Sequence, residues 1–556
     1  MKKYTIYICL FVTIFYLNRC KDLDLYPLDN MSDATFWETA DDFKTAANNL
    51  YNSLERFGYD DITSDIAFQS PNAVSNGSYQ LSETSTVWTD SYVYIRRANN
   101  ILEKAEGKTE SEIIRFIGET KFFRAYNYWK MFKIYGGIPL IDKILEATDP
   151  ELFKPRASRT ETIDFILKDL DEAAKVLPRQ KELPAGDIGR ITQGAALSMI
   201  ARVALFEGTW RKFRNEADAE KYLDIAIAAS NEVISSGQYS LFRDKGEESY
   251  FYLSIEEGDD SSESILDRRY QRNVLGHGMP YNYNGYGYNP TRKLVDMYLD
   301  KNGYPIMHEK SVFKGYSTFT SEYEDRDPRM TQTMTPPGTK TNRVFYPVEK
   351  VENWPNFPQS NANTGYILYK YMSWDLDGIN GGNNGDLSKF DYDKHLLRYA
   401  EVLLTYAEAV YERRGTITDE ELNKSINVVR NRVNMPPLTN DFVLSNNLDM
   451  REEIRRERTV ELALEGFRYD DLRRWKTGET ELPKDIKGIK IKNTEWENKA
   501  PYNDIYYQNK TDEEGFLIVE TGRIFDPKKH YLQPLPTKEV AFYQANGFVL
   551  EQNPNW

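Results

Sequence analysis

Four histidines could supply acid-base or metal chemistry to this chain: His277, His308, His395 and His530. They lie far apart, and none has a second histidine four residues away, the helical spacing that zinc sites use. The sequence also lacks a GxSxG elbow, a GxxxxGK(S/T) phosphate loop and a dinucleotide fingerprint after a strand. We therefore predict surface or packing roles for the histidines. The sequence gives no positive sign of an enzyme.

Paired carboxylates are the other route to hydrolysis, but 86 acidic residues offer too many pairs for spacing to select one. The best-ordered set is Glu457, Glu461 and Glu465, which recur every four residues. Side chains at this spacing share one face of a helix, where arginines can pair with them. We predict a structural ion-pair ladder with the arginines that accompany the set: Arg455, Arg458 and Arg468.

Both cysteines, Cys9 and Cys20, fall at the N-terminus. Lys2 and Lys3 precede an apolar run over residues 6–17, which is too short to span a bilayer, and a lipoprotein signal peptidase would cut just before Cys20. The sequence therefore predicts a signal peptide over residues 1–19, a lipidated Cys20 and a membrane-anchored chain outside the cytoplasm. The alternatives are an ordinary secretory signal and an uncut N-terminal anchor.

The charge of the chain excludes one class of partner. The formal net charge is −15, and removal of residues 1–19 makes it −18, because three basic residues and no acidic residue are lost. A nucleic acid needs clustered lysine and arginine, and an acidic chain repels it at long range. We therefore expect no nucleic-acid partner.

Periodic apolar residues predict the scaffold that would carry any site. Apolar positions recur every three or four residues in four pairs of helices. The pairs are residues 36–57 with 88–106, 111–134 with 160–177, 193–210 with 217–236, and 395–413 with 419–433. Pairs of this length resemble tetratricopeptide units, so we predict a mainly α fold with a curved helical scaffold.

The character of the sequence changes between residues 238 and 393. This stretch holds short apolar runs with many Gly, Pro, Asn and Tyr residues, and one helical period over residues 291–299. Loops and short strands on a rigid frame are where binding groups gather. We therefore divide the chain into a signal peptide (1–19), an N-terminal helical region (20–237), a loop-rich ligand-binding elaboration (238–393) and a C-terminal region that completes the scaffold (394–556).

Motifs in a fixed order carry a family resemblance across the mature chain. They lie at residues 20–24, 33–37, 88–99, 118–125, 135–139, 189–192, 326–329, 398–409, 453–462, 465–475 and 531–536. Taken together they resemble the SusD/RagB family of outer-membrane nutrient-binding lipoproteins. The resemblance implies a surface-exposed lipoprotein on the cell outer membrane, no catalysis, no cofactor, and a SusC-like TonB-dependent transporter as partner.

The resemblance also implies a site, because family members that bind glycans use an arc of aromatic rings. The richest candidate is the segment with Tyr281, Tyr283, Tyr286 and Tyr288, where tyrosines alternate with asparagine and glycine. A tyrosine-rich strand packed on the scaffold is the alternative. Further candidates are Trp354 and Trp374 in loops, and Tyr79 before a helix in which Trp88 is expected to be core.

We expect a non-catalytic protein that binds oligo- or polysaccharides and delivers them to the transporter. Peptide binding, as in the RagB branch, is the first alternative, since these loop residues do not separate sugar stacking from peptide packing. A surface glycan hydrolase and an adhesive protein are weaker alternatives. No EF-hand spacing supports a calcium site.

Overall fold

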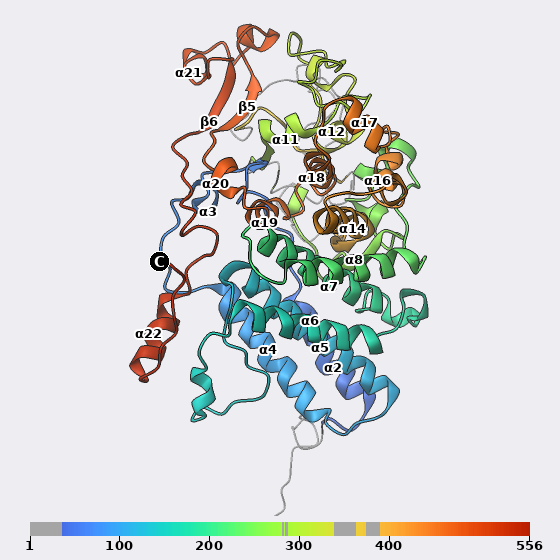
Figure 1. The fold of residues 1–556 in the computed structure, drawn as a ribbon, viewed down its shortest axis with the longest axis vertical. Coiled ribbons are helices and arrows are strands. Elements are labelled where there is room, and N and C mark those ends of the chain that lie inside the picture. The colour runs from blue at the N-terminus through green and yellow to red at the C-terminus, as the bar shows by residue number, and fades with distance from the viewer. Residues whose placement is uncertain (1–35, 281–282, 284–286, 338–362, 374–389) are drawn as a thin grey trace, which may run out of the picture.

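The structure, a computed structural model, describes residues 36–280, 283, 287–337, 363–373 and 390–556. Consecutive antiparallel helices pack side by side from the lower end of the molecule to beyond its middle (Figure 1). These are α2 (Ala40–Leu50), α4 (Thr86–Lys104), α5 (Ser111–Tyr135), α6 (Arg159–Val176), α7 (Gln193–Lys212), α8 (Ala219–Ser235) and α14 (Tyr399–Arg414), followed by α15 (Asp419–Asn423) and α16 (Ile426–Arg432). The prediction of a mainly α fold with tetratricopeptide-like pairs is confirmed.

Local sequence signals explain where these helices begin and end. Thr39 caps α2 and Ser158 caps α6, and in each case the third helical residue returns a side-chain bond to the cap residue. Gly415 ends α14 in the left-handed region, at φ +77°. The expected second helix of the fourth pair is interrupted at Lys424 and Ser425, so it forms α15 and α16 instead of one rod.

The apolar residues form one large core between the helices and a second core above it. Helices α5 and α7 are buried on nearly every face, which places them at the centre of the first core. The second core joins segments from residues 283–372 to segments from residues 460–517. The loop-rich stretch is therefore packed against the C-terminal region, which includes α18 (Met450–Glu461) and α19 (Arg468–Arg474).

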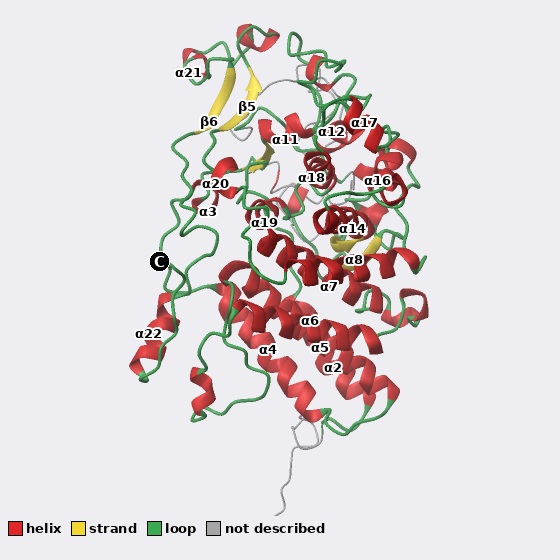
Figure 2. Ribbon diagram, in the orientation of Figure 1, coloured by secondary structure: helices red, strands yellow, loops and turns green. Residues whose placement is uncertain are grey.

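Strands are short and paired in twos among the described residues (Figure 2). All three pairs are antiparallel: β1 (Ala67–Phe68) with β3 (Asn289–Pro290), β2 (Ser264–Arg268) with β4 (Lys394–Arg398), and β5 (Ile486–Lys490) with β6 (Phe516–Glu520). Short helices fill the remaining connections: α3 (Ala73–Asn76), α9 (Ser249–Tyr252), α11 (Arg292–Met297), α12 (Pro328–Thr333), α17 (Asn440–Ser445), α20 (Gly478–Glu481), α21 (Ile505–Gln508) and α22 (Thr537–Ala545).

In the described ranges, none of the helices combines the length and the apolar character needed to cross a bilayer.

Candidate functional site

His395 on β4 is the histidine with the strongest acid-base potential, yet both its ring nitrogens have structural partners. Nδ1 lies 2.7 Å from Asp267 Oδ1, and Nε2 lies 2.8 Å from the carbonyl oxygen of Leu253. Burial alone would lower the pKa of His395, but the charge of Asp267 and these hydrogen bonds outweigh it and raise the pKa to about 9. An imidazolium with a hydrogen bond at each ring nitrogen joins β4 to Asp267 of β2 and to Leu253, and neither nitrogen is left to activate a nucleophile.

The other histidines also serve the fold. His277 packs against the rings of Phe57 and Tyr392, and its burial lowers the pKa to about 4. His308 and His530 each accept or share hydrogen bonds with nearby main-chain groups. No cluster of three or more His, Cys, Asp or Glu residues that could hold a metal occurs among the described residues. The predicted surface and packing roles of the histidines are confirmed.

Stability is expected to fall as pH rises from about 6.5 to about 9. In this window the folded state retains the His395 proton that the unfolded chain, with a histidine pKa of about 6.5, has released. Burial raises the pKa of Asp259 to about 8, so the folded state also keeps the proton of this carboxyl group up to that pH. Its loss lowers the free energy of unfolding in the same direction as the loss of the His395 proton. We expect the free energy of unfolding to decrease by about 1–3 kcal/mol, measured by urea denaturation across the window.

The control for this prediction is His395→Gln, which keeps polar contacts without a proton that titrates. The variant should be less stable at pH 6.5, and its stability should fall less steeply with pH. An identical pH dependence in the variant and the parent would contradict the assignment.

The acidic ladder is structural, as predicted, but its partners are not the arginines predicted for it. Glu461 lies 2.7 Å from Arg398 and 3.0 Å from Arg329, and it also pairs with Arg432. All of these side chains are buried. Burial would raise the pKa of Glu461, but the three guanidinium groups hold it well below its usual range.

The accompanying arginines form ion pairs with other acidic residues. Arg468 pairs with Asp65, and Arg458 with Asp471. The predicted single helix was also wrong, because α18 ends at Glu461, which leaves Glu465 beyond it and places Arg468 in α19. The distant partners could not be identified from the local spacing.

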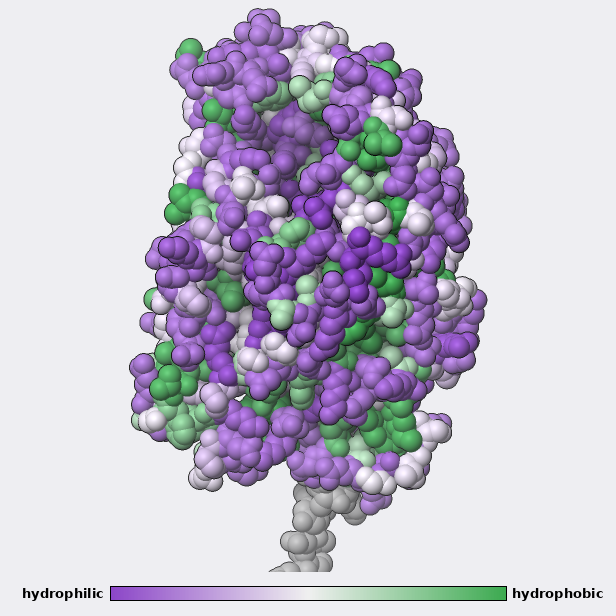
Figure 3. All heavy atoms as spheres, in the orientation of Figure 1, coloured by the Kyte–Doolittle hydropathy of each residue, from purple (hydrophilic) through white to green (hydrophobic). Residues whose placement is uncertain are grey.

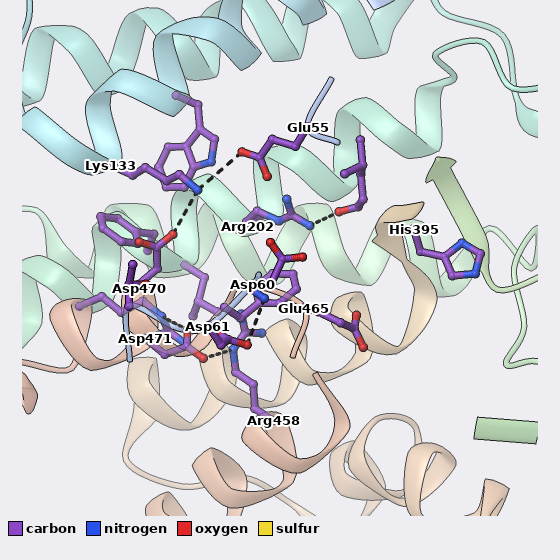
Figure 4. Close-up of a pocket in the computed structure, with 18 of the residues that line it drawn as sticks. Glu55, Asp60, Asp61, Lys133, Arg202, His395, Arg458, Glu465, Asp470 and Asp471 are labelled. Atoms are coloured by element: carbon purple, nitrogen blue, oxygen red, sulfur yellow. Dashed lines mark hydrogen bonds and ion pairs between the residues drawn. The ribbon is translucent and has the colours of Figure 1, made fainter. Parts of the chain in front are cut away.

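A polar cavity of about 270 Å³ lies between the helical scaffold and the C-terminal region (Figure 4). Lys133 of α5 lies 3.4 Å from Asp470 of α19 and 3.9 Å from Glu55. Lys394 donates to Asp60 at 2.7 Å. Ion pairs thus cross the cavity from segments far apart in sequence.

Asp61 is a carboxyl group of this cavity with a strongly shifted pKa. Burial raises the pKa of Asp61 to about 7. Its two oxygens accept hydrogen bonds from the main-chain N–H groups of Gly466, at 3.1 Å, and Arg468, at 2.9 Å. A glycosidase needs one carboxylic acid and one carboxylate that both face the substrate. Asp61 faces backbone donors instead, so this cavity assembles a structural network.

Two predicted ligand residues lie where a ligand cannot reach them in this conformation. Tyr283 and Tyr288 are each 1% exposed and belong to the second core. The Tyr283 hydroxyl donates to the carbonyl of Gly58 at 2.8 Å, and that of Tyr288 donates to the carbonyl of Asp60. These rings hold the segment that lines the polar cavity, so the packing alternative applies to Tyr283 and Tyr288.

Tyr79 lies at a partly exposed surface and has aromatic neighbours. Its ring centroid is 5.7 Å from that of Trp556, the last residue, and Trp556 is 5.9 Å from His530. The Lys529 ammonium lies 3.9 Å above the Trp556 ring. We call these four residues the Tyr79 surface. The expectation of Trp88 as core is confirmed, since its side chain is buried in α4.

The loop that carries Tyr79 is fixed against the C-terminal segment. Gly77 has φ +76°, and a Cβ atom there would lie 2.1 Å from the carbonyl oxygen of Ile524. The N–H of Ile524 donates to the carbonyl of Asn76, beside α3, and Arg523 donates to Ser75. Figure 1 shows the C-terminus beside α3. Only glycine allows this close approach, so the loop presents Tyr79 on a rigid support.

The remaining predicted site residues, Cys20, Tyr281, Tyr286, Trp354 and Trp374, lie outside the described residues. Sequence reasoning missed Trp556, His530 and Lys529. They are more than 440 positions from Tyr79, and no local pattern links the two segments.

The fold and these sites define a class: a helical-repeat scaffold that carries loop-borne aromatic groups, with the buried His277, His395 and carboxylates committed to structure. Family models match both parts of the chain. The SusD family matches residues 247–556, and a family described as starch-binding and associating with the outer membrane matches residues 25–205. The chain belongs to the SusD family.

Relatives agree with this assignment over most of the chain. SusD-like protein P38 of Formosa agariphila is 24% identical over 515 residues, which cover 85% of this chain and 92% of the relative. The starch-binding protein SusD of Bacteroides thetaiotaomicron is 26% identical over 158 residues, 26% of this chain and 27% of the relative. A SusD-like protein from Bacteroides fragilis has a similar structure, with a TM-score of 0.74, 26% identity, and coverage of 96% of this chain and all of that one.

Proposed function

We propose that this protein is a non-catalytic, lipid-anchored glycan-binding protein of the outer membrane that faces the cell exterior and delivers glycans to a SusC-like TonB-dependent transporter. The observation that carries the proposal is the Tyr79 surface, a group of partly exposed rings on a rigid loop in a chain of the SusD family. The starch-binding description of the family model matched by residues 25–205, and the name of the starch-binding relative, support a glycan as ligand.

The chemistry of the Tyr79 surface suits a sugar. Aromatic rings cover the apolar faces of pyranose rings, and Tyr79 and His530 are partly exposed, so their polar tips are available to sugar hydroxyl groups. Exposed polar side chains, Ser78 and Gln80, lie next to Tyr79 in the loop. Weak binding at such a surface is sufficient, because tethering to the membrane raises the effective concentration near the transporter and permits release.

Glycan and oligopeptide arrays, probed with the chain that begins at Lys21, test the proposal. We expect binding to one glycan class, and about tenfold weaker binding when Trp556→Ala removes a stacking ring, which corresponds to about 1.4 kcal/mol. Tyr79→Ala should have a similar effect. Tyr506→Ala, which removes an exposed ring on α21, is the matched control and should leave binding unchanged.

Three outcomes would each contradict one part of this proposal, namely the ligand class, the absence of catalysis and the location of the site. Binding to oligopeptides alone would favour the RagB-like alternative. Release of shorter sugars from the bound glycan would favour a hydrolase. Equal glycan binding by the parent and the Trp556→Ala variant would remove the Tyr79 surface as the site.

A further inference from the structure

An apolar groove separate from the Tyr79 surface lies between α4, the loop over residues 139–152, and α22. Its volume is about 460 Å³. Trp88, Tyr92 and Ile95 of α4 form one wall. The loop and α22 form the others with Pro139, Ile141, Leu145, Leu152, Phe542 and Tyr543.

The rim of this groove exposes large apolar side chains. Val93 of α4 is 43% exposed, and Phe542 of α22 is 53% exposed. Phe548 and Val549, which follow α22, are also exposed. Figure 3 shows hydrophobic atoms gathered over the position of α22, at the lower left. An apolar patch of this kind, next to a groove, marks a surface that binds a partner.

Most side chains that line the groove are apolar, and several of its polar groups are engaged within the chain. The Tyr92 hydroxyl donates to the carbonyl of Pro139 at 2.7 Å. Arg96 donates to the carbonyl of Leu145 at 2.8 Å, and the Tyr543 hydroxyl donates to the carbonyls of Leu152 and Lys154. Thr89, Lys143 and Glu539 also line the groove, and Lys143 pairs with Glu151. A sugar would meet few polar partners on these mainly apolar walls and would lose hydrogen bonds to water. The groove therefore fits an apolar side chain better than a sugar.

The rigid attachment of α22 makes the groove a formed surface. Phe153 stacks on Phe548 at 4.6 Å with an interplanar angle of 4°, and it also contacts Tyr543 edge to face at 5.5 Å. These contacts hold α22 beside the loop, with Phe542 left exposed. A partner would meet an ordered groove and would lose little entropy in binding.

The length of chain outside the structure indicates where the partner lies. Sixteen residue steps separate Cys20 from Phe36, the first described residue, and they span at most about 55 Å. Helices α2, α4 and α22 lie at the same end of the molecule in Figure 1. The end that carries the groove is thus held near the membrane by the proposed lipid anchor.

We infer that the groove docks an apolar side chain on an extracellular loop of the outer-membrane transporter, an inference that rests on the proposed function. Leucine, methionine or phenylalanine would fill the groove, while Val93 and Phe542 pack around it. A few such anchors carry most of the affinity of an interface, and the tether supplies the effective concentration.

Affinity purification of the tagged, full-length lipoprotein from its native outer membrane tests this inference. TonB-dependent transporter recovered with it is quantified by peptide mass spectrometry. Val93→Glu and Phe542→Glu place a charge on the rim at half-exposed side chains, and each should reduce the recovered transporter at least tenfold. Phe542 also packs on Phe153 at 5.4 Å, and Val93→Glu leaves that contact intact. Leu444→Glu and Ile505→Glu, at apolar side chains that are 82% and 70% exposed elsewhere, are matched controls and should recover as much as the parent.

Two results would overturn the inference, and they differ in what else they affect. Equal recovery by the parent and both rim variants would place the interface elsewhere and leave the transporter partnership intact. Absence of transporter from the parent sample would remove the partnership itself. Glycan binding by the purified Phe542→Glu variant should equal that of the parent, which separates docking from ligand binding.

Discussion

Replacement of Glu461 by glutamine is expected to lower the free energy of unfolding by about 3–5 kcal/mol, because it leaves buried guanidinium groups without their shared carboxylate. Arg329, Arg398 and Arg432 come from three separate elements and meet at this one side chain. Glutamine has the same shape but supplies only one acceptor oxygen and no charge. The decrease in the free energy of unfolding therefore measures lost electrostatic interactions and hydrogen bonds, because the packing volume is unchanged.

Urea denaturation, followed by circular dichroism at neutral pH, measures the effect. Glu452→Gln is the control, because Glu452 lies on the same helix, its side chain is 62% exposed, and it pairs with Arg455 at 3.4 Å. An exposed pair contributes about 0–1 kcal/mol, so this variant should unfold close to the parent. Similar midpoints for Glu461→Gln and Glu452→Gln would show that the buried network contributes little to stability.

The same network explains why a family could be identified from the sequence. The motif over residues 326–329 supplies Arg329, that over 398–409 supplies Arg398, and that over 453–462 supplies Glu461. These residues meet in the core and are required by the fold, whatever the ligand. Motifs of this kind identify the scaffold of a binding protein and give no information on what it binds.

The helical scaffold could be predicted because its signals are local. Apolar residues at three- and four-residue steps, capping residues such as Thr39 and Ser158, and a terminal Gly415 act within one or two turns. The break between α15 and α16 was not predicted, since the apolar period continues through Lys424 and Ser425.

The ligand site could be predicted only in part because it depends on contacts between distant segments. Alternation of tyrosine with asparagine and glycine is compatible with either an exposed strand or a packed one, and Tyr283 and Tyr288 are packed. Tyr79 meets Trp556 only after the whole chain has folded. A pairing across that distance leaves no periodic pattern in the sequence.

Loss of the lipid anchor should have the largest effect on where the protein resides. When residues 1–20 are replaced by an ordinary cleavable secretory signal, so that the mature chain begins at Lys21, we expect nearly all of the protein to move from the membrane fraction to the soluble fraction, because acylation at Cys20 is the attachment we propose. Each buried methylene contributes about 0.8 kcal/mol to membrane binding, and two or more acyl chains anchor a protein stably where one binds only marginally. Fractionation of cells by ultracentrifugation and immunoblotting measures the change.

Cys9→Ala is the matched control, since Cys9 lies inside the apolar run that signal peptidase would remove. This variant should remain in the membrane fraction, and its mature form should begin at an acylated Cys20 in a mass spectrum. A parent protein that keeps residues 1–19 and carries no acyl group on Cys20 would instead identify an uncut N-terminal anchor. The soluble protein that begins at Lys21 should bind glycan as tightly as the detergent-solubilised parent, because the Tyr79 surface is built from residues far from the anchor.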